Sequence, residues 1–140
     1  MSKVAIVFWS GTGNTASMAD AVAEGAKDAG AEVTVFGPSD FDKSMVPDFD
    51  GIAFGCPAMG AEVLEEMEYE PMFTDVEGAL SGKKIGLFGS YGWGDGQWMR
   101  DWEDRCNDAG AVLAAPPVMA NESPDTDALD ECRALGKALS

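Results

Sequence analysis

The fold is decided by the stretch VAIVFWSGTGNT, residues 4–15. Its first six residues, 4–9, are all apolar and predict a strand that is covered on both faces, as in parallel sheets. A loop rich in glycine and hydroxyl groups, 10–15, follows, and apolar residues then recur at helical spacing. Where a loop opens a helix, free backbone N–H groups and the positive end of the helix dipole converge. The stretch therefore predicts an anion site between a buried strand and a helix.

The loop 10–15 also supplies four polar side chains, those of Ser10, Thr12, Asn14 and Thr15. No Lys or Arg lies in or beside the loop, so neutral donors would hold a phosphate there. Gly11–Ala16 fits G-x-G-x-x-A, a weak dinucleotide fingerprint, but the acid expected after the second strand is replaced by Phe36-Gly37-Pro38. The four donors favour a terminal monophosphate. The competing interpretation is a helix start that is merely capped by Thr12 or Asn14.

Strand and helix patterns alternate along the rest of the chain. Strands are predicted at 4–9, 33–36, 51–55, 85–88 and 111–115, the last broken by Pro116-Pro117 before 118–119. Helices are predicted from the loop 10–15 to Gly30, from Pro71 to Gly82, from Trp98 to Gly110, and after the cap signal Ser123-Pro124. The segment 37–49 predicts an irregular connection. This order predicts an α/β fold, a doubly wound five-stranded parallel sheet of order 2-1-3-4-5, with the strand 33–36 at an edge.

Composition narrows the possible functions. With 140 residues and 46% hydrophobic content, we expect one globular domain, 1–140. The net charge of −16 excludes nucleic acid as an expected partner and favours a basic protein surface, although solubility or a salty cytoplasm would explain it equally well. The chain has no His, which excludes Ser-His and Cys-His catalysis and His-rich metal sites.

The cysteines and the N-terminal sequence indicate the cellular compartment of the protein. Cys56, Cys106 and Cys132 lack C-x-x-C spacing and predict reduced thiols. The N-terminus has no signal pattern, and no apolar run approaches the roughly 18 residues of a membrane span. We therefore expect a cytoplasmic protein without membrane contact.

Ligands of doubly wound sheets bind at the carboxyl ends of the strands, and three of the loops there have unusual composition. Besides 10–15 these are 56–62, which contains Met59, and 89–96, which contains Trp93 among glycines. Glycines beside a Trp let a flat ligand approach the main chain, and Met is a polarisable contact of similar reach. The alternatives are a hydrophobic plug for Trp93 and ordinary packing for Met59. By default we expect Trp9, Trp98 and Trp102 to belong to the core.

Taken together, the three loops resemble the flavodoxins, and most closely the short-chain, clostridial type. The resemblance rests on WSGTGNT at 9–15, Ala58-Met59-Gly60-x-Glu62, and GSYGWGDG at 89–96, and it covers essentially the whole chain. It implies the five-stranded flavodoxin-like fold and non-covalently bound FMN. The implied function is low-potential one-electron transfer between redox proteins by a monomer, without substrate turnover.

The resemblance also implies roles for individual residues. Ser10, Thr12, Asn14 and Thr15, with the loop amides that include Gly11 and Gly13, would bind the FMN phosphate. Met59 and Trp93 would sandwich the isoalloxazine ring. The Gly60–Ala61 peptide would lie beside flavin N5, and Glu62 would accept a hydrogen bond from N3–H. The remaining residues assigned to the cofactor are Ala58, Ser90, Tyr91, Gly92, Gly94 and Asp95, with Asn121 reaching the ring or the ribityl side.

Two positions depart from the family pattern. Ala61 stands where close relatives often have Asp, and it would raise the cost of a left-handed conformation there by roughly 1 kcal/mol. Pro57 stands where relatives often have a hydroxyl residue, which removes one donor near the phosphate.

An acidic run follows the Met59 loop and comprises Glu62, Glu65, Glu66, Glu68 and Glu70. We expect it to repel charge added to the flavin, which would lower the second reduction potential. We also expect it to guide a basic partner toward the site.

Two other classes of protein remain open at this point. The first is an FMN-dependent quinone or NAD(P)H reductase on the same fold, but such enzymes usually carry insertions for a substrate pocket, which this chain lacks. The second is a non-redox phosphate-binding or receiver-type domain. That class needs clustered acids after the first strand, where this chain has Ser10-Gly11-Thr12.

Overall fold

The computed structural model describes residues 2–11, 13–58, 64–92 and 96–140. Its strands are β1 (Lys3–Phe8), β2 (Glu32–Phe36), β3 (Gly51–Gly55), β4 (Lys84–Tyr91), β5 (Val112–Leu113) and β6 (Val118–Asn121). They form one parallel sheet of order β2-β1-β3-β4-β5, in which β6 also pairs with β4. The predicted strand order is confirmed. So is the edge position of β2, where Val35 is 53% exposed.

The last strand of the sheet is split in two. β5 pairs with the start of β4, at Lys84 and Ile85, and β6 pairs with the end of β4, from Phe88 to Tyr91. Pro116 and Pro117 lie between the two pieces and have no N–H to donate to a ladder. The predicted break is confirmed, although β5 is shorter than the predicted strand 111–115. Because of the split, β6 runs beside the carboxyl end of β4.

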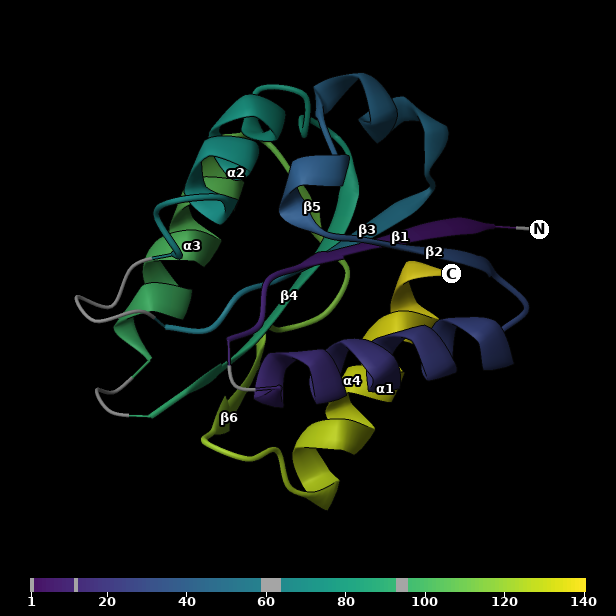
Figure 1. The fold of residues 1–140 in the computed structure, drawn as a ribbon. Helices are drawn as coiled ribbons and strands as arrows, with labels where there is room; N and C mark the ends of the chain where they lie inside the picture. The colour runs from purple at the N-terminus through teal and green to yellow at the C-terminus, as the bar shows by residue number, and fades with distance from the viewer. Residues whose placement is uncertain (1, 12, 59–63, 93–95) are drawn as a thin grey trace.

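Two helices cover each face of the sheet (Figure 1). α1 (Asn14–Asp28) and α4 (Thr126–Leu139) lie side by side on one face, and α2 (Tyr69–Glu77) and α3 (Gln97–Asp108) lie on the other. The segment predicted to be irregular contains two short 3₁₀ helices, η1 (Pro38–Asp40) and η2 (Lys43–Asp48). The doubly wound arrangement is therefore the predicted one.

A separate hydrophobic core lies on each face of the sheet. The core under α2 and α3 contains Trp98 and Trp102, each only 2% exposed, so both belong to the core as predicted. The ring of Trp102 meets those of Tyr69 and Phe73 edge to face, at centroid distances of 5.8 and 5.7 Å. The core under α1 and α4 is built from smaller side chains, such as Ala23 and Ala26. Smaller side chains let those two helices approach each other closely.

Two helix starts differ from the prediction, and both are set by a carboxylate. α2 begins at Tyr69 rather than Pro71, because Glu65 accepts hydrogen bonds from the backbone N–H groups that precede and open the helix. α4 begins after Asp125, whose side chain accepts from the N–H of Ala128 at 2.8 Å, so the predicted Ser123-Pro124 cap is wrong. Asp caps a helix as well as Ser does. Which of two neighbouring candidates caps the helix depends on the path of the backbone, and the cap motif in the sequence does not show that path.

Candidate functional site

A cavity of about 430 Å³ opens at the carboxyl edge of the sheet, where β1, β3, β4 and β6 end. Its walls come from each of the loops that follow those strands. The described residues that line it are Trp9, Gly11, Asn14, Pro57, Ala58, Ser90, Tyr91, Gly92 and Glu122. The volume lies in the range of small-molecule sites. Six of these residues, Gly11, Asn14, Ala58, Ser90, Tyr91 and Gly92, were assigned to the cofactor from sequence.

The loop 10–15 is organised by Ser10. Its Oγ accepts the backbone N–H of Gly13 at 3.0 Å and that of Ala16 at 3.3 Å. The hydroxyl therefore uses its acceptor capacity within the loop and keeps its own hydrogen for donation. Gly13 is the N-cap of α1, has a φ of 94°, and makes no side-chain cap. Capping by Asn14, the alternative considered from sequence, is therefore wrong.

The first turn of α1 leaves backbone donors unsatisfied. Among the described residues, the N–H groups of Asn14 and Thr15 have no partner within the protein. The first amides of a helix lack intrahelical acceptors and carry the positive end of the dipole. Since Asn14 also lines the cavity, these donors meet it at one end. An anionic group there would satisfy them.

Thr15 and Ser90 connect the loop 10–15 to the loop after β4. Thr15 is fully buried and Ser90 is 4% exposed, and their hydroxyl oxygens lie 3.1 Å apart. The carbonyl of Ser90 also accepts the N–H of Ala58 at 3.0 Å. Ser90 thus joins all three loops that the sequence singled out. Thr15 is placed against Ser90 rather than on the open surface of the cavity.

Two residues of the cavity wall differ from the sequence interpretation. Trp9, expected in the core by default, is partly buried: it packs against the core under α2 and α3 and also lines the cavity. The wall also includes Glu122, the one non-glycine residue with positive φ, 57°, in the described part of the chain. Its N–H donates to the carbonyl of Tyr91 at 2.6 Å. Asn121, the residue assigned from sequence, is exposed at the end of β6 and is not among the lining residues. Nothing in the sequence pattern distinguished Glu122 from its neighbour.

Several predicted cofactor residues lie outside the described residues. They are Thr12, Met59, Gly60, Ala61, Glu62, Trp93, Gly94 and Asp95. Their assignments remain predictions from the sequence. Ala58 and Gly92, which directly precede the segments 59–63 and 93–95, both line the cavity.

The acidic run does not form one uniform rim. Glu65 is 6% exposed and accepts three backbone N–H groups at the start of α2, and Glu70 is bound by Arg105 of α3. Glu66 and Glu68 are exposed to solvent. Glu65 and Glu70 therefore have partners inside the protein, backbone N–H groups for Glu65 and Arg105 for Glu70. The expected repulsion of charge on the flavin stays a prediction.

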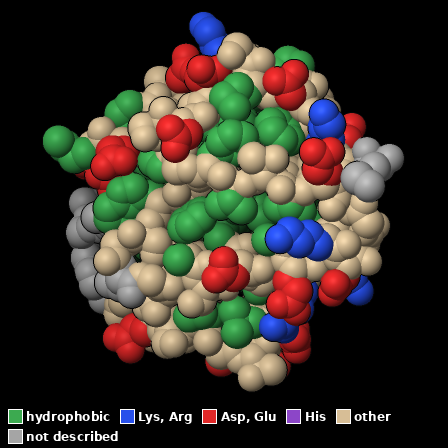
Figure 2. All heavy atoms as spheres, turned by 45° about the vertical axis from the view of Figure 1, so that its right-hand side comes forward, with side chains coloured by type: hydrophobic (Ala, Val, Ile, Leu, Met, Phe, Trp, Pro, Cys, Tyr) green, Lys and Arg blue, Asp and Glu red, His purple; other side chains and the backbone are tan. Residues whose placement is uncertain are grey.

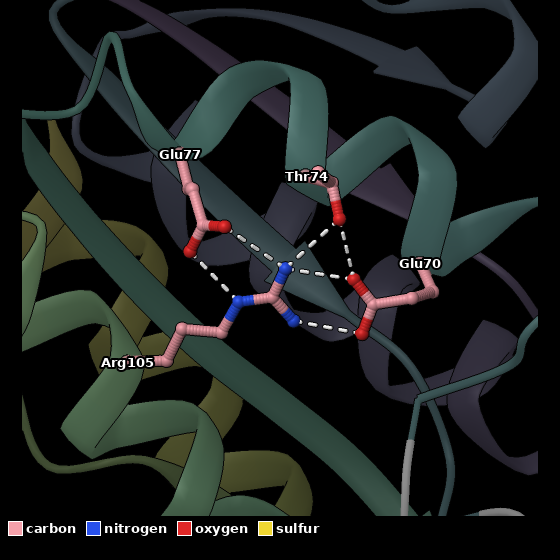
Figure 3. A network of polar contacts seen from close by, with 4 residues as sticks. All are labelled: Glu70, Thr74, Glu77 and Arg105. Atoms are coloured by element: carbon pink, nitrogen blue, oxygen red, sulfur yellow. Dashed lines mark hydrogen bonds and ion pairs between the residues drawn. The ribbon is translucent and has the colours of Figure 1, made fainter.

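Arg105 connects α2 and α3 (Figure 3). Its guanidinium lies 2.7 Å from carboxylate oxygens of both Glu70 and Glu77, and it also donates to Thr74 at 3.1 Å. Its Cζ lies 4.9 Å from the centre of the Phe73 ring. Hydrogen bonds from Arg105 lower the pKa of Glu70, and those to Glu70 raise the pKa of Arg105. The single positive charge of Arg105 is thus shared between the carboxylates of Glu70 and Glu77.

A larger and more open hollow, of about 580 Å³, lies on α2 and α3. It is lined by Glu77, Gly78, Asp101, Asp104, Arg105, Asp108 and Ala109. Four carboxylates around one guanidinium would repel a phosphate. The smaller cavity at the carboxyl edge is therefore the candidate site.

The residues of the smaller cavity suit FMN. Asn14, at the start of α1, offers a backbone donor for a phosphate, and Trp9, Pro57, Ala58 and Tyr91 offer apolar surface for a ring. The Ser10 hydroxyl belongs to the adjoining loop and is not among the lining residues. None of the described lining residues is basic, so dipoles rather than cations would hold the phosphate. When bound, FMN would supply one-electron chemistry, while the protein would bind, orient and shield it.

The fold and this cavity define a class, the doubly wound α/β proteins that bind a phosphate-bearing ligand at the carboxyl edge of the sheet. Within that class, the chain belongs to the flavodoxin family. The sequence model of the family, described as Flavodoxin, matches residues 6–136.

The similarity to individual flavodoxins extends over nearly the whole chain. A flavodoxin from Clostridium beijerinckii is 45% identical over 135 residues, covering 96% of this chain and 97% of its own. One from Megasphaera elsdenii is 48% identical over 137 residues and covers 98% of each. The solution structure of the two-electron reduced Megasphaera elsdenii flavodoxin matches with a TM-score of 0.89 over 97% of both chains, at 48% identity. The short-chain type predicted from the sequence is confirmed.

Family membership establishes the general function. Flavodoxins bind FMN and carry electrons to redox partner proteins, and they are not substrate-turnover enzymes. These relatives favour the electron carrier over the reductase and the receiver-type domain. No helix in the described part of the chain is long and apolar enough to cross a membrane.

Proposed function

We propose that FMN binds with its phosphate on the loop 10–15 and its ring in the cavity at the carboxyl edge of the sheet. The observation that carries this proposal is that one cavity is lined both by the start of α1, at Asn14, and by the loop after β4, at Tyr91 and Gly92. Met59 and Trp93 are proposed to flank the ring, the Gly60–Ala61 peptide to lie beside N5, and Glu62 to accept from N3–H. These roles are supported by the sequence resemblance and by the placement of the neighbouring residues Ala58 and Gly92.

Replacing Ser10 with alanine tests the phosphate assignment. Ser10→Ala removes one donor to the phosphate and the oxygen that accepts two backbone N–H groups of the loop, so the Kd for FMN should rise about tenfold, equivalent to about 1.4 kcal/mol. Riboflavin lacks the phosphate, so its Kd should change less than about twofold. Both constants can be measured from the quenching of flavin fluorescence by the apoprotein.

Ser17, in the first turn of α1, offers a matched control. It is exposed, and its hydroxyl donates only to the carbonyl of Gly13. Ser17→Ala should leave both constants unchanged. If Ser10→Ala weakens riboflavin as much as FMN, the loop 10–15 does not bind the phosphate.

We also infer that the protein docks as a monomer on basic surfaces of its redox partners, in the cytoplasm. The net charge of −16 supports attraction to basic partners and opposes self-association. Acidic side chains are dispersed around an apolar centre on the face shown in Figure 2. Attraction would therefore be exerted by this face as well as by the rim of the cavity. All three cysteines are free and buried, which supports a reducing compartment.

Ionic strength tests the docking proposal. The rate of electron transfer to a small basic haem protein should fall about tenfold between 0.05 and 0.5 M salt, because screening shortens the reach of the charges. An uncharged quinone serves as the control oxidant, and its rate should not change. A salt-independent rate with the haem protein would contradict the docking proposal.

A further inference from the structure

The end of β4 is held through its backbone carbonyls on two sides. The carbonyl of Ser90 accepts the N–H of Ala58, which follows β3, at 3.0 Å. The carbonyl of Tyr91 accepts the N–H of Glu122, which follows β6, at 2.6 Å. All four residues line the cavity at the carboxyl edge of the sheet. The two hydrogen bonds therefore connect three walls of the cavity to one another.

The side chain of Tyr91 is held by a different element. The centre of its ring lies 5.4 Å from that of Trp98 in α3, and the ring packs against the core under α2 and α3. The indole N–H of Trp98 in turn donates to the carbonyl of Cys56 at 3.1 Å. The ring is thus fixed by α3, whereas the carbonyl of the same residue is fixed by the residue after β6.

The hydrogen bond from Glu122 is made in an uncommon backbone conformation. The register of β4 and β6 ends with the pair Tyr91 and Asn121, so Glu122 lies one residue beyond the ladder. Its φ is 57°, the one positive value at a non-glycine residue in the described part of the chain. A left-handed conformation is unfavourable for a residue with a Cβ and persists where the surrounding structure holds it, often at functional sites. Here the bond to the Tyr91 carbonyl is the contact that holds it.

This contact also sets the orientation of the backbone at Gly92. A peptide unit is planar and trans, so fixing the carbonyl of Tyr91 fixes the N–H of Gly92 on its opposite side. Because the carbonyl points toward Glu122, this N–H points away from it. Gly92 lines the cavity and has no side chain, so the wall that it forms is backbone. The conformation at residue 122 therefore determines how this part of the wall faces a ligand.

From these contacts we infer that Glu122 is a positioning residue for the FMN site, one that orients the Tyr91–Gly92 peptide through its left-handed backbone rather than acting on the flavin through its carboxylate. Its side chain is exposed, which agrees with a role of the backbone. Apoprotein in which residue 122 leaves this conformation loses the bond to Tyr91. The apparent Kd for FMN then rises as the competent fraction falls. The inference rests on the assignment of FMN to this cavity.

Three substitutions at this position remove the same charge but differ in their tolerance of a positive φ. Glycine adopts it without strain, glutamine adopts it about as readily as glutamate, and valine, which is β-branched, strongly disfavours it. The Kd for FMN should therefore fall about threefold in Glu122→Gly, stay within about 1.5-fold in Glu122→Gln, and rise about tenfold in Glu122→Val. Quenching of flavin fluorescence by each apoprotein gives these constants. If the carboxylate acted on the flavin, the three variants would change alike.

Ser123 provides the matched control for the valine variant. It is the next residue in the chain, it is exposed, and its φ is not positive. Its side chain does not cap α4, because Asp125 does. Ser123→Val should leave the Kd for FMN within about 1.5-fold of the wild type.

Riboflavin separates the wall after β4 from the phosphate site. The proposed placement puts the ring of the flavin, and not its phosphate, beside Gly92. Glu122→Val should therefore raise the Kd for riboflavin by the same factor as that for FMN, about tenfold. This result would contrast with Ser10→Ala, in which the effect should be confined to FMN.

Amide hydrogen exchange on the apoproteins tests the contact with Tyr91 without any flavin. After correction for intrinsic rates, the amide of residue 122 should exchange about tenfold faster in Glu122→Val and about threefold more slowly in Glu122→Gly than in the wild type. The amides of β3 should keep their protection in both variants. That pattern would exclude a general loss of stability as the cause of weaker binding.

Equal Kd values for Glu122→Gly and Glu122→Val would overturn the inference. If Glu122→Val does not fold, Glu122→Gly and Glu122→Gln carry the same comparison, and equal constants for those two would overturn it. If Ser10→Ala weakens riboflavin as much as FMN, the assignment of the phosphate fails, whereas exchange at residue 122 still reports whether its backbone holds the Tyr91 carbonyl.

Discussion

Replacing Gly92 with leucine should reduce FMN affinity about 100-fold or more while leaving the protein folded. Gly92 lines the cavity, and a Cβ built there would meet no protein atom within 4 Å. The new side chain can therefore enter the space assigned to the flavin without disturbing the protein. Excluding a ligand from its site by filled volume costs about 3 kcal/mol or more, which corresponds to about 100-fold in Kd. Flavin fluorescence and a thermal melt of the apoprotein would measure the two effects.

Gly78 is the control for this substitution. It follows α2, it is exposed, and a Cβ at this position also meets nothing within 4 Å. Gly78→Leu adds the same side chain away from the cavity and should leave FMN affinity unchanged. If Gly92→Leu binds FMN within about threefold of the wild type, the cavity is not the flavin site.

The second large effect concerns stability. Gly25→Ala in α1 should lower the free energy of unfolding by about 3 kcal/mol. A Cβ at Gly25 would lie 1.9 Å from the backbone oxygen of Arg133 in α4, so the two helices would have to separate. The gain in helix propensity from glycine to alanine is only about 1 kcal/mol and cannot offset this clash. Urea denaturation of the apoprotein would give the difference.

The contact between α1 and α4 is reciprocal, which supplies an independent check. A Cβ at Gly136 in α4 would lie 2.1 Å from the backbone oxygen of Val22 in α1, so Gly136→Ala should cost a similar amount. Gly78→Ala, where a Cβ is unopposed, should be neutral or stabilising by up to about 1 kcal/mol. A loss below about 1 kcal/mol in both interhelical variants would contradict the close approach of the helix backbones.

The two substitutions illustrate different kinds of glycine, which the sequence shows with the same letter. Gly92 lies in a glycine-rich loop at a strand end, and its sequence context already indicated a ligand. Gly25 and Gly136 lie inside helical patterns, where sequence reasoning alone counts them only as weak helix formers. Their role became visible once α1 and α4 were placed against each other, since the close contact depends on the positions of both backbones.

Much of the candidate site was predictable because it depends on local patterns. An apolar run followed by Ser10 and two glycines specifies a strand, a turn and a helix start within a few residues, and parallel topology then gathers the loops at one edge. Trp9 and Glu122 were missed for the opposite reason. Whether Trp9 faces the core or the cavity, and whether Glu122 or Asn121 reaches the wall, depends on the twist and register of strands that are distant in sequence.

The acidic residues show most clearly which properties the sequence determines and which depend on the tertiary structure. The sequence by itself determined the strand order, the resemblance to the flavodoxins and the large negative charge, because these follow from the order of the elements, three loop motifs and the composition. Only the tertiary structure decided that Glu65 is buried and accepts backbone N–H groups, that Glu70 is paired with Arg105, and that Glu66 and Glu68 remain in solvent. A carboxylate's energy depends on the donors and the water around it, and those are supplied by segments that the fold brings together.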